Sequence, residues 1–364
     1  MLWHIVADRS YFHCPYQFDQ YCFMENKAPT IKEIAKRLNI SVSTVSRALH
    51  DHPSIGLRTK TNVQKLAAEL GYEPNMSALS LKHGKTYNIG VIIPNLREEF
   101  FSKAISGIED HAMAHDYSVL IGQTHDDPVR EQKVLQAFLR HRVDGLIISL
   151  TKHTSDLTKF RELAAIHFPM VFFDRVPTGE NFHTVNSNMY DATRQAIEYL
   201  FEKGHKRIAL INGPKEMISS LQRFEMYKTA MQKRRLKIDM QLVVSSDFSK
   251  EGTYAAMEEL LSLKNKPTAV LITNDYVALD AIQYAKKHNI KINEDLIFVS
   301  YANTPITYYI EDHPIASVEQ YPYKQAQRAT EILFDHMDRK TKGLDITYVH
   351  ESVEPCLIET DKIR

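Results

Sequence analysis

The chain has 364 residues, of which 43% are hydrophobic and 25% are charged, with equal numbers of acidic and basic side chains. This length and composition predict two or three domains with a sizeable core and exclude disorder as the main state. The cysteines at 14, 22 and 356 show no paired spacing and no apolar run is long, so a disulfide scaffold and a membrane-spanning helix are excluded and a reducing cytoplasm is expected.

Residues 1–29 are rich in aromatic side chains but show no helical or strand period, so they are interpreted as an N-terminal extension. Met24 comes shortly before the first patterned segment. We hypothesise that Met24 is the true start and that residues 1–23 result from a misplaced gene start. The alternative is a genuine aromatic tail that packs on the body of the protein.

Residues 30–75 have the pattern of a compact helical domain. Thr30 and Glu33 have the spacing of a capping box, in which the Thr hydroxyl accepts from a backbone amide and the Glu carboxylate reaches back to the cap amide. A short turn follows the first helix, and Ser41 is expected to cap the second. The pattern therefore predicts two short helices joined by a tight turn.

A third helix and a local excess of positive charge complete this domain. The helix is expected from about residue 59 to residue 70, and Gly71 fits the position that ends it. Residues 30–85 carry nine Lys or Arg against four Asp or Glu. This basic block favours a polyanion-binding domain, although a solvated helical surface explains the charges equally well.

The first two helices and their turn have the arrangement of a helix-turn-helix. In the run SVSTVSRALH, Val45 and Ala48 face the core, whereas Val42, Ser43 and Arg47 face outward, where Arg47 can pair with guanine O6 and N7. An ordinary three-helix bundle with an exposed arginine has the same spacing and stands as the alternative. The residues expected at the DNA in this domain are Thr30, Ser41, Val42, Ser43, Thr44, Ser46 and Arg47.

Residues 76–86 are interpreted as a hinge segment, because they are too few for a stable isolated helix but can become helical on a partner. From residue 87, apolar strands alternate with helices, which is typical of parallel sheets covered on both faces. Expected strands are 88–93, 118–121, 145–149, 171–173, 207–211, 242–245, 269–272 and 296–300. In the second half, helices are expected near 190–203, 221–235, 250–263 and 275–287.

These elements form two sets, which predicts two α/β lobes within residues 87–358. The first lobe is expected to comprise about 87–187 and 320–345, and the second about 188–318 and 346–358. Because ligands bind at the carboxyl ends of parallel strands, the cleft between the lobes is the expected binding site.

No motif in the sequence supports an enzyme, since phosphate-binding glycine loops, G-x-S-x-G and H-E-x-x-H are all lacking. His111 and His115 have a spacing that metal ligation allows, but no third ligand is nearby, which favours a solvated surface pair. The segment 125–127 is expected to form a turn and a helix cap. We therefore expect no catalytic residue, no metal site and no cofactor.

The run TIKEIAKRLNISVSTVSRALHDHPSIGLRTKTNVQKLAAELGYEPN resembles the N-terminal domain of the LacI/GalR family of bacterial transcription regulators. The likeness continues through ALSLKHGKT, NIGVIIPNL, GHKRIALING, PTAVLITND and IASVEQ, and so spans about residue 30 to the C-terminus. It implies an all-α helix-turn-helix head and a two-lobed α/β core similar to periplasmic sugar-binding proteins. It also implies a homodimer that binds operator DNA under the control of a small effector.

The resemblance further implies how the hinge segment works. Hinge helices of the two subunits lie side by side in the minor groove, and a leucine from each wedges into the central base step. Leu81 stands at that position, and Lys82 would add phosphate attraction. A linker leucine packed on the core is the alternative. Leu79 replaces an arginine that is usual in the family, which puts the usual contact at that site in doubt.

The resemblance also implies an effector site in the cleft, where aromatic, acidic, amide and guanidinium groups suit a sugar or sugar derivative. Two departures set this chain apart, because Ala302 replaces a common acidic residue and Met226 replaces a common glycine. An acidic sugar attracted by the arginines is therefore an open possibility, and for each residue capping or salt bridging is the alternative. The expected effector residues are Phe100, Phe101, Asp174, Arg175, Arg223, Asn274, Asp275 and Gln320.

The expected function is thus a sequence-specific transcription regulator, a repressor, whose operator affinity depends on a carbohydrate-like effector. The alternative is a cytoplasmic sugar-binding sensor whose head no longer recognises a specific operator. A more distant alternative is an enzyme that works in the cleft.

Overall fold

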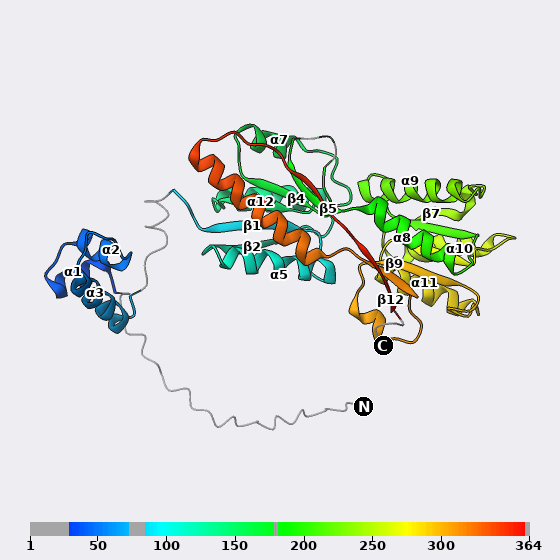
Figure 1. The fold of residues 1–364 in the computed structure, drawn as a ribbon, viewed down its shortest axis with the longest axis horizontal. Helices are drawn as coiled ribbons and strands as arrows, with labels where there is room; N and C mark the ends of the chain where they lie inside the picture. The colour runs from blue at the N-terminus through cyan, green and yellow to red at the C-terminus, as the bar shows by residue number, and fades with distance from the viewer. Residues whose placement is uncertain (1–28, 73–83, 178, 180, 361–364) are drawn as a thin grey trace, which may run out of the picture. The chain divides into compact units, whose positions relative to one another are not determined.

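The computed structural model describes residues 29–72, 84–177, 179 and 181–360 (Figure 1). The chain divides into two compact units, Met1–His83 and Gly84–Arg364. The proposed start at Met24 and the expected hinge contacts of Leu81 and Lys82 lie outside the described residues.

The first unit contains the three short helices that the sequence predicts. They are α1 (Ile31–Leu38), α2 (Val42–Leu49) and α3 (Leu57–Leu70). One small core joins them, formed by Ile34, Ala35, Val45, Ala48, Val63 and Ala67. The expected inward positions are confirmed, because Val45 and Ala48 are fully buried.

The ends of these helices confirm most of the predicted caps. The hydroxyls of Thr30 and Ser41 accept hydrogen bonds from the third residue beyond each, and Gly71 ends α3 in the left-handed region at φ 60°. The capping box is only half formed, however. The Glu33 carboxylate does not reach back to Thr30 but accepts a hydrogen bond from Arg37, because a charged donor one turn away competes for it. The third helix also begins two residues earlier than expected.

The second unit begins with a sheet whose strand order in the described residues is β11-β5-β4-β3-β1-β2 (Figure 1). All its pairings are parallel. Its strands are β1 (Asn88–Ile93), β2 (Ser118–Gln123), β3 (Gly145–Ile148), β4 (Met170–Phe173), β5 (His183–Ser187) and β11 (His350–Val353). Its helices are α5 (Glu99–Met113), α6 (Pro128–Arg140), α7 (Thr158–Ala165) and α12 (Pro322–Lys342).

Helices cover both faces of this first sheet, as the continuous apolar strands predict. One face packs against α5 and α12, and the other against α6 and α7. Gly107 lets α5 and α12 approach closely, because a Cβ there would lie 2.5 Å from the Tyr323 carbonyl oxygen. The sheet and its helices form the first lobe.

The second sheet has the strand order β12-β10-β9-β8-β6-β7 in the described residues, with α8 and α9 on one face and α10 and α11 on the other. Its strands are β6 (Ile208–Asn212), β7 (Val243–Ser245), β8 (Ala269–Ile272), β9 (Ile297–Tyr301), β10 (Ala316–Glu319) and β12 (Cys356–Glu359). Its helices are α8 (Met189–Glu202), α9 (Ile218–Lys233), α10 (Lys250–Ser262) and α11 (Asp275–Lys287), with short 3-10 turns at Met240–Leu242 and Pro305–Tyr308.

The chain passes between the lobes three times, after β5, after β10 and after β11. The position of the last crossing differs from the expected boundary between the lobes. Residues 346–358 were expected in the second lobe, but β11 pairs with β5 in the first sheet, and only β12 joins the second, antiparallel to β10. The reason is that the polar strand β11 completes the free edge of the first sheet before the chain crosses.

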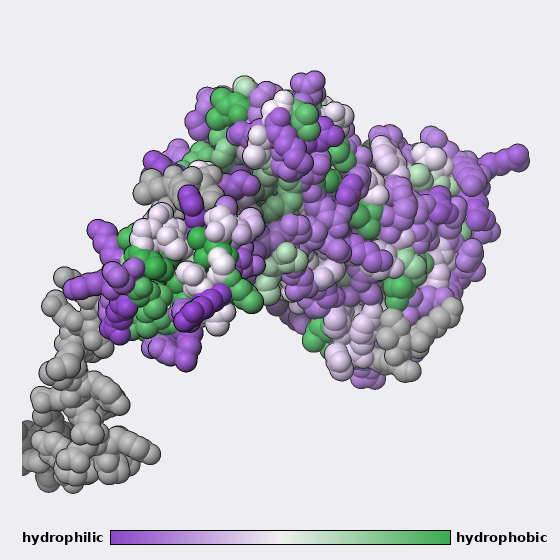
Figure 2. Space-filling view, turned by 60° about the vertical axis from the view of Figure 1, so that its left-hand side comes forward, coloured by the Kyte–Doolittle hydropathy of each residue, from purple (hydrophilic) through white to green (hydrophobic). Residues whose placement is uncertain are grey.

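The surface of the second unit that faces the viewer in Figure 2 is mostly hydrophilic, with small, separate hydrophobic areas. The apolar strands account for this pattern, since their side chains lie beneath the helices. Within the described ranges, no helix is both long and apolar enough to cross a membrane.

Candidate functional site

The N-terminus of α2 gathers hydroxyl groups. Ser41 Oγ accepts a hydrogen bond from the Thr44 backbone N–H at 3.1 Å and lies 2.7 Å from Ser43 Oγ and 2.8 Å from Thr44 Oγ1. Ser46 is partly buried one turn further along the helix. Backbone amides and small hydroxyls at a helix N-terminus suit phosphate contacts, so this end of α2 fits a nucleic-acid backbone.

The outer face of α2 carries the side chains expected to reach base edges. Val42 is 42% exposed, and Ser43 and Arg47 are exposed beside it. The Arg47 guanidinium has no hydrogen bond or salt bridge to any other described residue. An unpaired arginine on a short helix with a solvated face is able to form two hydrogen bonds to one guanine. Thr30, by contrast, is held as the cap of α1, although it stays exposed.

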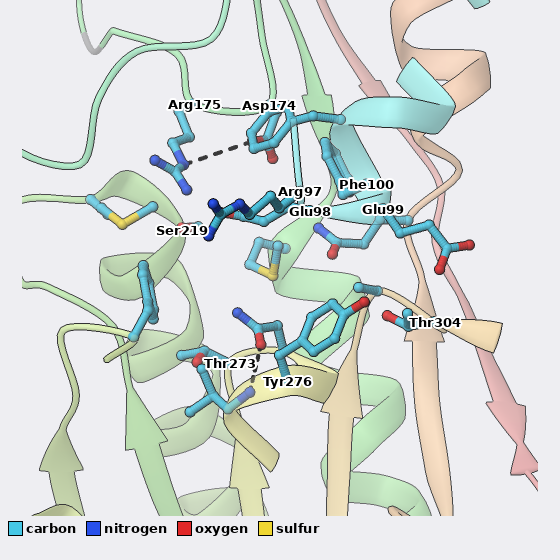
Figure 3. A pocket seen from close by; sticks show the side chains of 18 of the residues that line it. Arg97, Glu98, Glu99, Phe100, Asp174, Arg175, Ser219, Thr273, Tyr276 and Thr304 are labelled. Atoms are coloured by element: carbon cyan, nitrogen blue, oxygen red, sulfur yellow. Dashed lines mark hydrogen bonds and ion pairs between the residues drawn. The ribbon is translucent and has the colours of Figure 1, made fainter. Parts of the chain in front are cut away.

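A cavity of about 360 Å³ lies between the two lobes of the second unit. It forms where the strands end, because Asp174 and Arg175 follow β4, Asn274 follows β8 and Gln320 follows β10. In Figure 3 the first lobe contributes Arg175 and Asp174 at the top, and the second lobe contributes Thr273, Tyr276 and Thr304 from below. This placement agrees with the expected binding site at the carboxyl ends of the strands.

Most of the expected effector residues come together in this cavity. Those that line it are Phe100, Phe101, Asp174, Arg175, Arg223, Asn274 and Gln320. They come from widely separated parts of the chain and from both lobes.

Asp275 is the exception and corrects the expectation. It is fully buried beneath the wall, where it accepts hydrogen bonds from Ser300 Oγ, from Ser317 Oγ at 2.8 Å and from the Thr304 backbone N–H at 2.6 Å. Burial raises the pKa of this carboxyl, and the three donors oppose that rise. The alternative capping role is also wrong, because Asn274 caps α11. Asp275 therefore shapes the cavity wall without facing a ligand.

Two neighbouring rings on α5 form the aromatic part of the wall that the first lobe contributes. Phe100 and Phe101 meet edge to face with their centroids 5.3 Å apart. Phe101 is only 1% exposed and packs against Phe173, so Phe100 is the ring that is open to the cavity. An accessible ring of this kind can stack on the apolar face of a sugar or on a planar ring.

On one side of the cavity, several carboxyl groups surround the Arg175 side chain. Its guanidinium lies 2.5 Å from an Asp126 oxygen and 3.9 Å from Asp174. Burial raises the pKa of Asp174 to about 6 despite the attraction of Arg175. Burial likewise raises the pKa of Glu98, and Arg175 opposes that rise. These carboxyl groups keep free acceptor positions beside Arg175, and so they can accept hydrogen bonds from ligand hydroxyls.

Two buried polar atoms on the opposite wall, one on Arg223 and one on Thr273, lack hydrogen-bond partners. Arg223 is 6% exposed, and its Nε makes no hydrogen bond, although another nitrogen of the same guanidinium lies 3.3 Å from Asn212 Oδ1. Thr273 is 4% exposed, and its hydroxyl is also unpaired. Desolvation lowers the pKa of Arg223. Unpaired buried polar groups are costly, so a water or a ligand group that reaches these two atoms would reduce that cost.

Sequence reasoning missed several residues of the cavity wall. Arg97 and Glu98 precede α5, Met217 precedes α9, and Phe248 and Tyr276 complete the second lobe's side. Ala302 stands where the family commonly has an acidic residue, and it contributes only a methyl group to the wall. Its backbone has φ 93°. No local sequence pattern marks these wall residues as a site, because their side chains come together only when the two lobes face each other.

The histidine pair on α5 was expected to be solvated, but only His115 is exposed, whereas His111 is half-buried. The rings of His111 and His115 lie 4.7 Å apart, and His115 stacks on Phe334 at 4.5 Å. Among the described residues, no group of three potential ligands is arranged to hold a metal ion.

Comparison with known proteins links both sites to one family. A model described as bacterial regulatory proteins, lacI family, matches residues 30–75. A model described as periplasmic binding proteins and sugar binding domain of LacI family matches residues 86–348. These two matches cover the helical head and most of the two-lobed core.

Individual relatives agree with the family models. The HTH-type transcriptional repressor CytR of Escherichia coli is 32% identical over 321 residues, which cover 88% of this chain and 93% of that protein. The HTH-type transcriptional repressor PurR of Histophilus somni is 28% identical over 325 residues, covering 88% and 96%. The Lac repressor dimer bound to operator and the anti-inducer ONPF has the same fold, with a TM-score of 0.78, 23% identity and coverage of 92% and 98%.

Proposed function

The chain belongs to the LacI family of bacterial regulatory proteins, and from this premise we propose that a sugar or sugar derivative in the inter-lobe cavity controls its affinity for operator DNA. The chain is an effector-regulated, DNA-binding repressor with a helix-turn-helix head and a periplasmic-binding-protein-like core. The carbohydrate nature of the effector, the homodimer and the cytoplasmic location are parts of the proposal.

One observation carries the proposed effector class. The cavity combines the accessible ring of Phe100 with unpaired buried donors on Arg223 and Thr273 and with the partly neutralised carboxyl of Asp174. A sugar has an apolar ring face and a rim of hydroxyls that both donate and accept, and so it satisfies all these groups at once. A purely apolar ligand would leave the Arg223 and Thr273 groups unpaired.

The proposed mechanism uses the differential affinity of two core conformations. In a homodimer, each head places α2 in the major groove of one half-site, where Arg47 reads a guanine. The effector binds one arrangement of the lobes more tightly than the other, and this difference shifts the operator affinity. A DNA-binding repressor acts where the chromosome is, which supports the cytoplasmic location.

Thermal-shift measurements with a panel of sugars and sugar acids test the effector class, because a ligand that binds the native state raises the melting temperature. The same compounds are then added to a complex of the protein with a duplex enriched from a random pool. We expect a compound that raises the melting temperature also to change the affinity for that duplex. The proposal is wrong if no sugar does either. Failure to enrich any duplex would instead favour a sensor without operator recognition.

A further inference from the structure

Positive charge is concentrated in three loops of the second lobe. They comprise residues 202–207 at the end of α8, 233–239 at the end of α9 and 263–268 after α10. Together they carry nine Lys or Arg and two Asp or Glu, whereas the whole chain has 45 of each kind. We call these three loops the cationic end. Its nine cations are Lys203, Lys206, Arg207, Lys233, Arg234, Arg235, Lys237, Lys264 and Lys266.

Contacts through Arg207 hold the three loops together in one place. Its guanidinium donates to the Asn265 carbonyl oxygen at 2.8 Å and pairs with Asp239 at 3.0 Å. The Arg234 guanidinium lies 5.1 Å from the centroid of the Phe201 ring, so the ends of α8 and α9 also meet. The loops precede β6, β7 and β8 and so lie at the amino ends of these strands, away from the first lobe (Figure 1). The effector cavity lies at the carboxyl ends, so the cationic end is a separate surface.

Most of these cations have no acidic partner in the protein. Lys203 lies 3.8 Å from Glu359, and Lys233 lies 4.0 Å from Glu198. With Arg207, these two are the cations of the cationic end that form ion pairs with described residues. The other six are exposed and make no hydrogen bond or ion pair with any described residue, namely Lys206, Arg234, Arg235, Lys237, Lys264 and Lys266. Because like charges held close together repel each other, a bound polyanion would stabilise this surface.

The composition of the cationic end indicates the kind of partner. Interfaces between proteins have a core of apolar side chains in which charged residues are depleted. No large hydrophobic side chain within these three fully described loops is exposed, and only Met240 at their border is. Binding to DNA without regard to sequence needs cations alone, because it is driven by the release of counterions from the phosphates. The cationic end therefore fits a nucleic-acid backbone better than an acidic protein.

The function of the chain determines which polyanion it meets. As a DNA-binding repressor, it works beside a large excess of duplex DNA outside its operator. An anionic membrane also attracts basic surfaces, but stable binding there takes a second signal such as a lipid chain or an apolar helix face. The three loops expose no large apolar side chain that could supply such a signal. Duplex DNA is therefore the favoured partner.

We propose that the cationic end is a second DNA-binding surface, which holds duplex DNA through its phosphates without reading the sequence. Arg234 and Arg235 suit phosphate oxygens because a guanidinium can donate two parallel hydrogen bonds, and the lysines act as point charges. One molecule then holds its operator with the helical head and a separate stretch of duplex with the core. The inference is independent of the effector, because it concerns neither the inter-lobe cavity nor its ligand.

Capture of a second duplex by protein that is already on its operator tests the proposal. The full-length protein is bound to a sparsely immobilised operator duplex, enriched from a random pool, and unbound protein is washed away. A labelled duplex of scrambled sequence is then added. We expect the complex to retain it at about 50 mM salt and to release most of it at about 200 mM. If about four phosphates are neutralised, the affinity falls roughly a hundredfold over that range.

Two double variants with the same change of charge locate the surface. Lys237→Glu with Lys266→Glu reverses two cations of the cationic end, and Lys215→Glu with Lys250→Glu reverses two exposed cations at the cleft end of the same lobe. The first variant should bind the labelled duplex at least about tenfold more weakly. Its slope of log affinity against log salt should become shallower by about two, because each lost phosphate contact removes about 0.9. The control should keep both values, and both variants should keep their operator affinity and melting temperature.

Three results would overturn the proposal. The operator complex captures no labelled duplex, or the Lys237→Glu/Lys266→Glu variant captures as much as the control, or another polyanion binds better. Phosphatidylglycerol vesicles and polyglutamate are therefore offered to the same complex. Stronger retention of either one, lost in the same variant, assigns the cationic end to a membrane or to an acidic protein. In each case the repressor function and its effector cavity stand, because the operator stays bound throughout.

Discussion

The ammonium nitrogen of Lys152, which follows β3 in the first lobe, donates a hydrogen bond to the backbone carbonyl oxygen of Asp247, which follows β7 in the second lobe, at 2.8 Å. The same nitrogen lies 5.8 Å from the centroid of the Phe248 ring. Asp126 accepts from the Lys152 backbone N–H at 3.0 Å and so fixes the base of this side chain. The lobes are thus tied directly to each other at the cleft.

Lys152→Met should loosen the contact between the lobes in the ligand-free protein, because it removes a charged donor but keeps an apolar chain of similar length. A hydrogen bond to a charged group contributes about 1.5–3 kcal/mol, enough to shift an open–closed equilibrium about tenfold or more. Spin labels on α6 and α10, in a background without native cysteines, report the inter-lobe distance. Lys152→Arg keeps a donor and serves as the control. An unchanged distance distribution in the Met variant would refute the tie.

Arg47→Ala should reduce the preference for the selected operator over scrambled DNA. A bidentate arginine–guanine contact contributes about 1–3 kcal/mol of discrimination, or roughly 5–150-fold. Fluorescence anisotropy at one fixed salt concentration gives both affinities. Lys65→Ala removes the same charge from an exposed side chain on α3 and should leave the ratio unchanged. Equal loss of affinity for both duplexes in the Arg47 variant would show a phosphate contact instead.

Asp174→Asn should stabilise the protein at pH 7.5. Because burial raises the pKa of Asp174 from 3.8 to about 6, the folded state binds this proton more tightly than the unfolded chain does. Ionisation therefore lowers the free energy of unfolding above pH 6, and this loss disappears below pH 4. We expect a gain of about 1–2 kcal/mol at pH 7.5, less than the full shift implies because the side chain is 21% exposed.

Urea unfolding at pH 7.5, 6 and 4.5 measures this gain, which should shrink as the pH falls. Asp338→Asn, at an exposed position of α12, is the control and should change little at any pH. A gain that stays constant across the three pH values would mean that the substitution acts through packing and not through the carboxyl proton.

His183 and His336 should make the protein sensitive to acid. Both are 3% exposed, their ring centroids lie 5.0 Å apart, and burial lowers the pKa of each to about 4. The unfolded chain takes up these protons near pH 6.5, whereas the folded protein resists until about pH 4. The free energy of unfolding should therefore fall between pH 6.5 and 4, by up to about 3 kcal/mol per histidine.

The slope of stability against pH checks the assignment to these histidines. His336→Phe keeps an aromatic ring but removes one titrating group, so it should flatten the slope over this range. His153→Gln, at an exposed loop position, should leave the slope as in the wild type. A steep slope that persists in the Phe variant would place the acid sensitivity elsewhere.

The central strands were predictable because each is a short, continuous apolar run. Asn88–Ile93 and Ala269–Ile272, for example, appear in the structure with the predicted bounds. The edge strand β11 was assigned to the wrong lobe because its residues alternate between exposed and partly buried positions and carry no strong apolar signal. Its place follows from pairing with β5, which is a long-range contact that local sequence does not encode.

The candidate site was predictable where side chains follow apolar strands directly. Asp174 and Asn274 come after β4 and β8 and reach the cavity, as expected. Asp275 has the same sequence context but turns inward, because Ser300 and Ser317 on neighbouring strands offer it hydrogen bonds. The cavity as a whole exists only once both lobes are folded and face each other, so no local sequence pattern predicts it.

The final crossing of the chain has a consequence for the gene. Only two residues separate β11 from β12, yet these strands close the edges of different sheets. A stop codon or frameshift just upstream of His350 would remove a border strand from each lobe simultaneously, and so even a very late truncation is expected to act as a null allele. For the same reason neither lobe is encoded by one uninterrupted stretch, and recombination that exchanges a whole lobe between relatives would need several breakpoints.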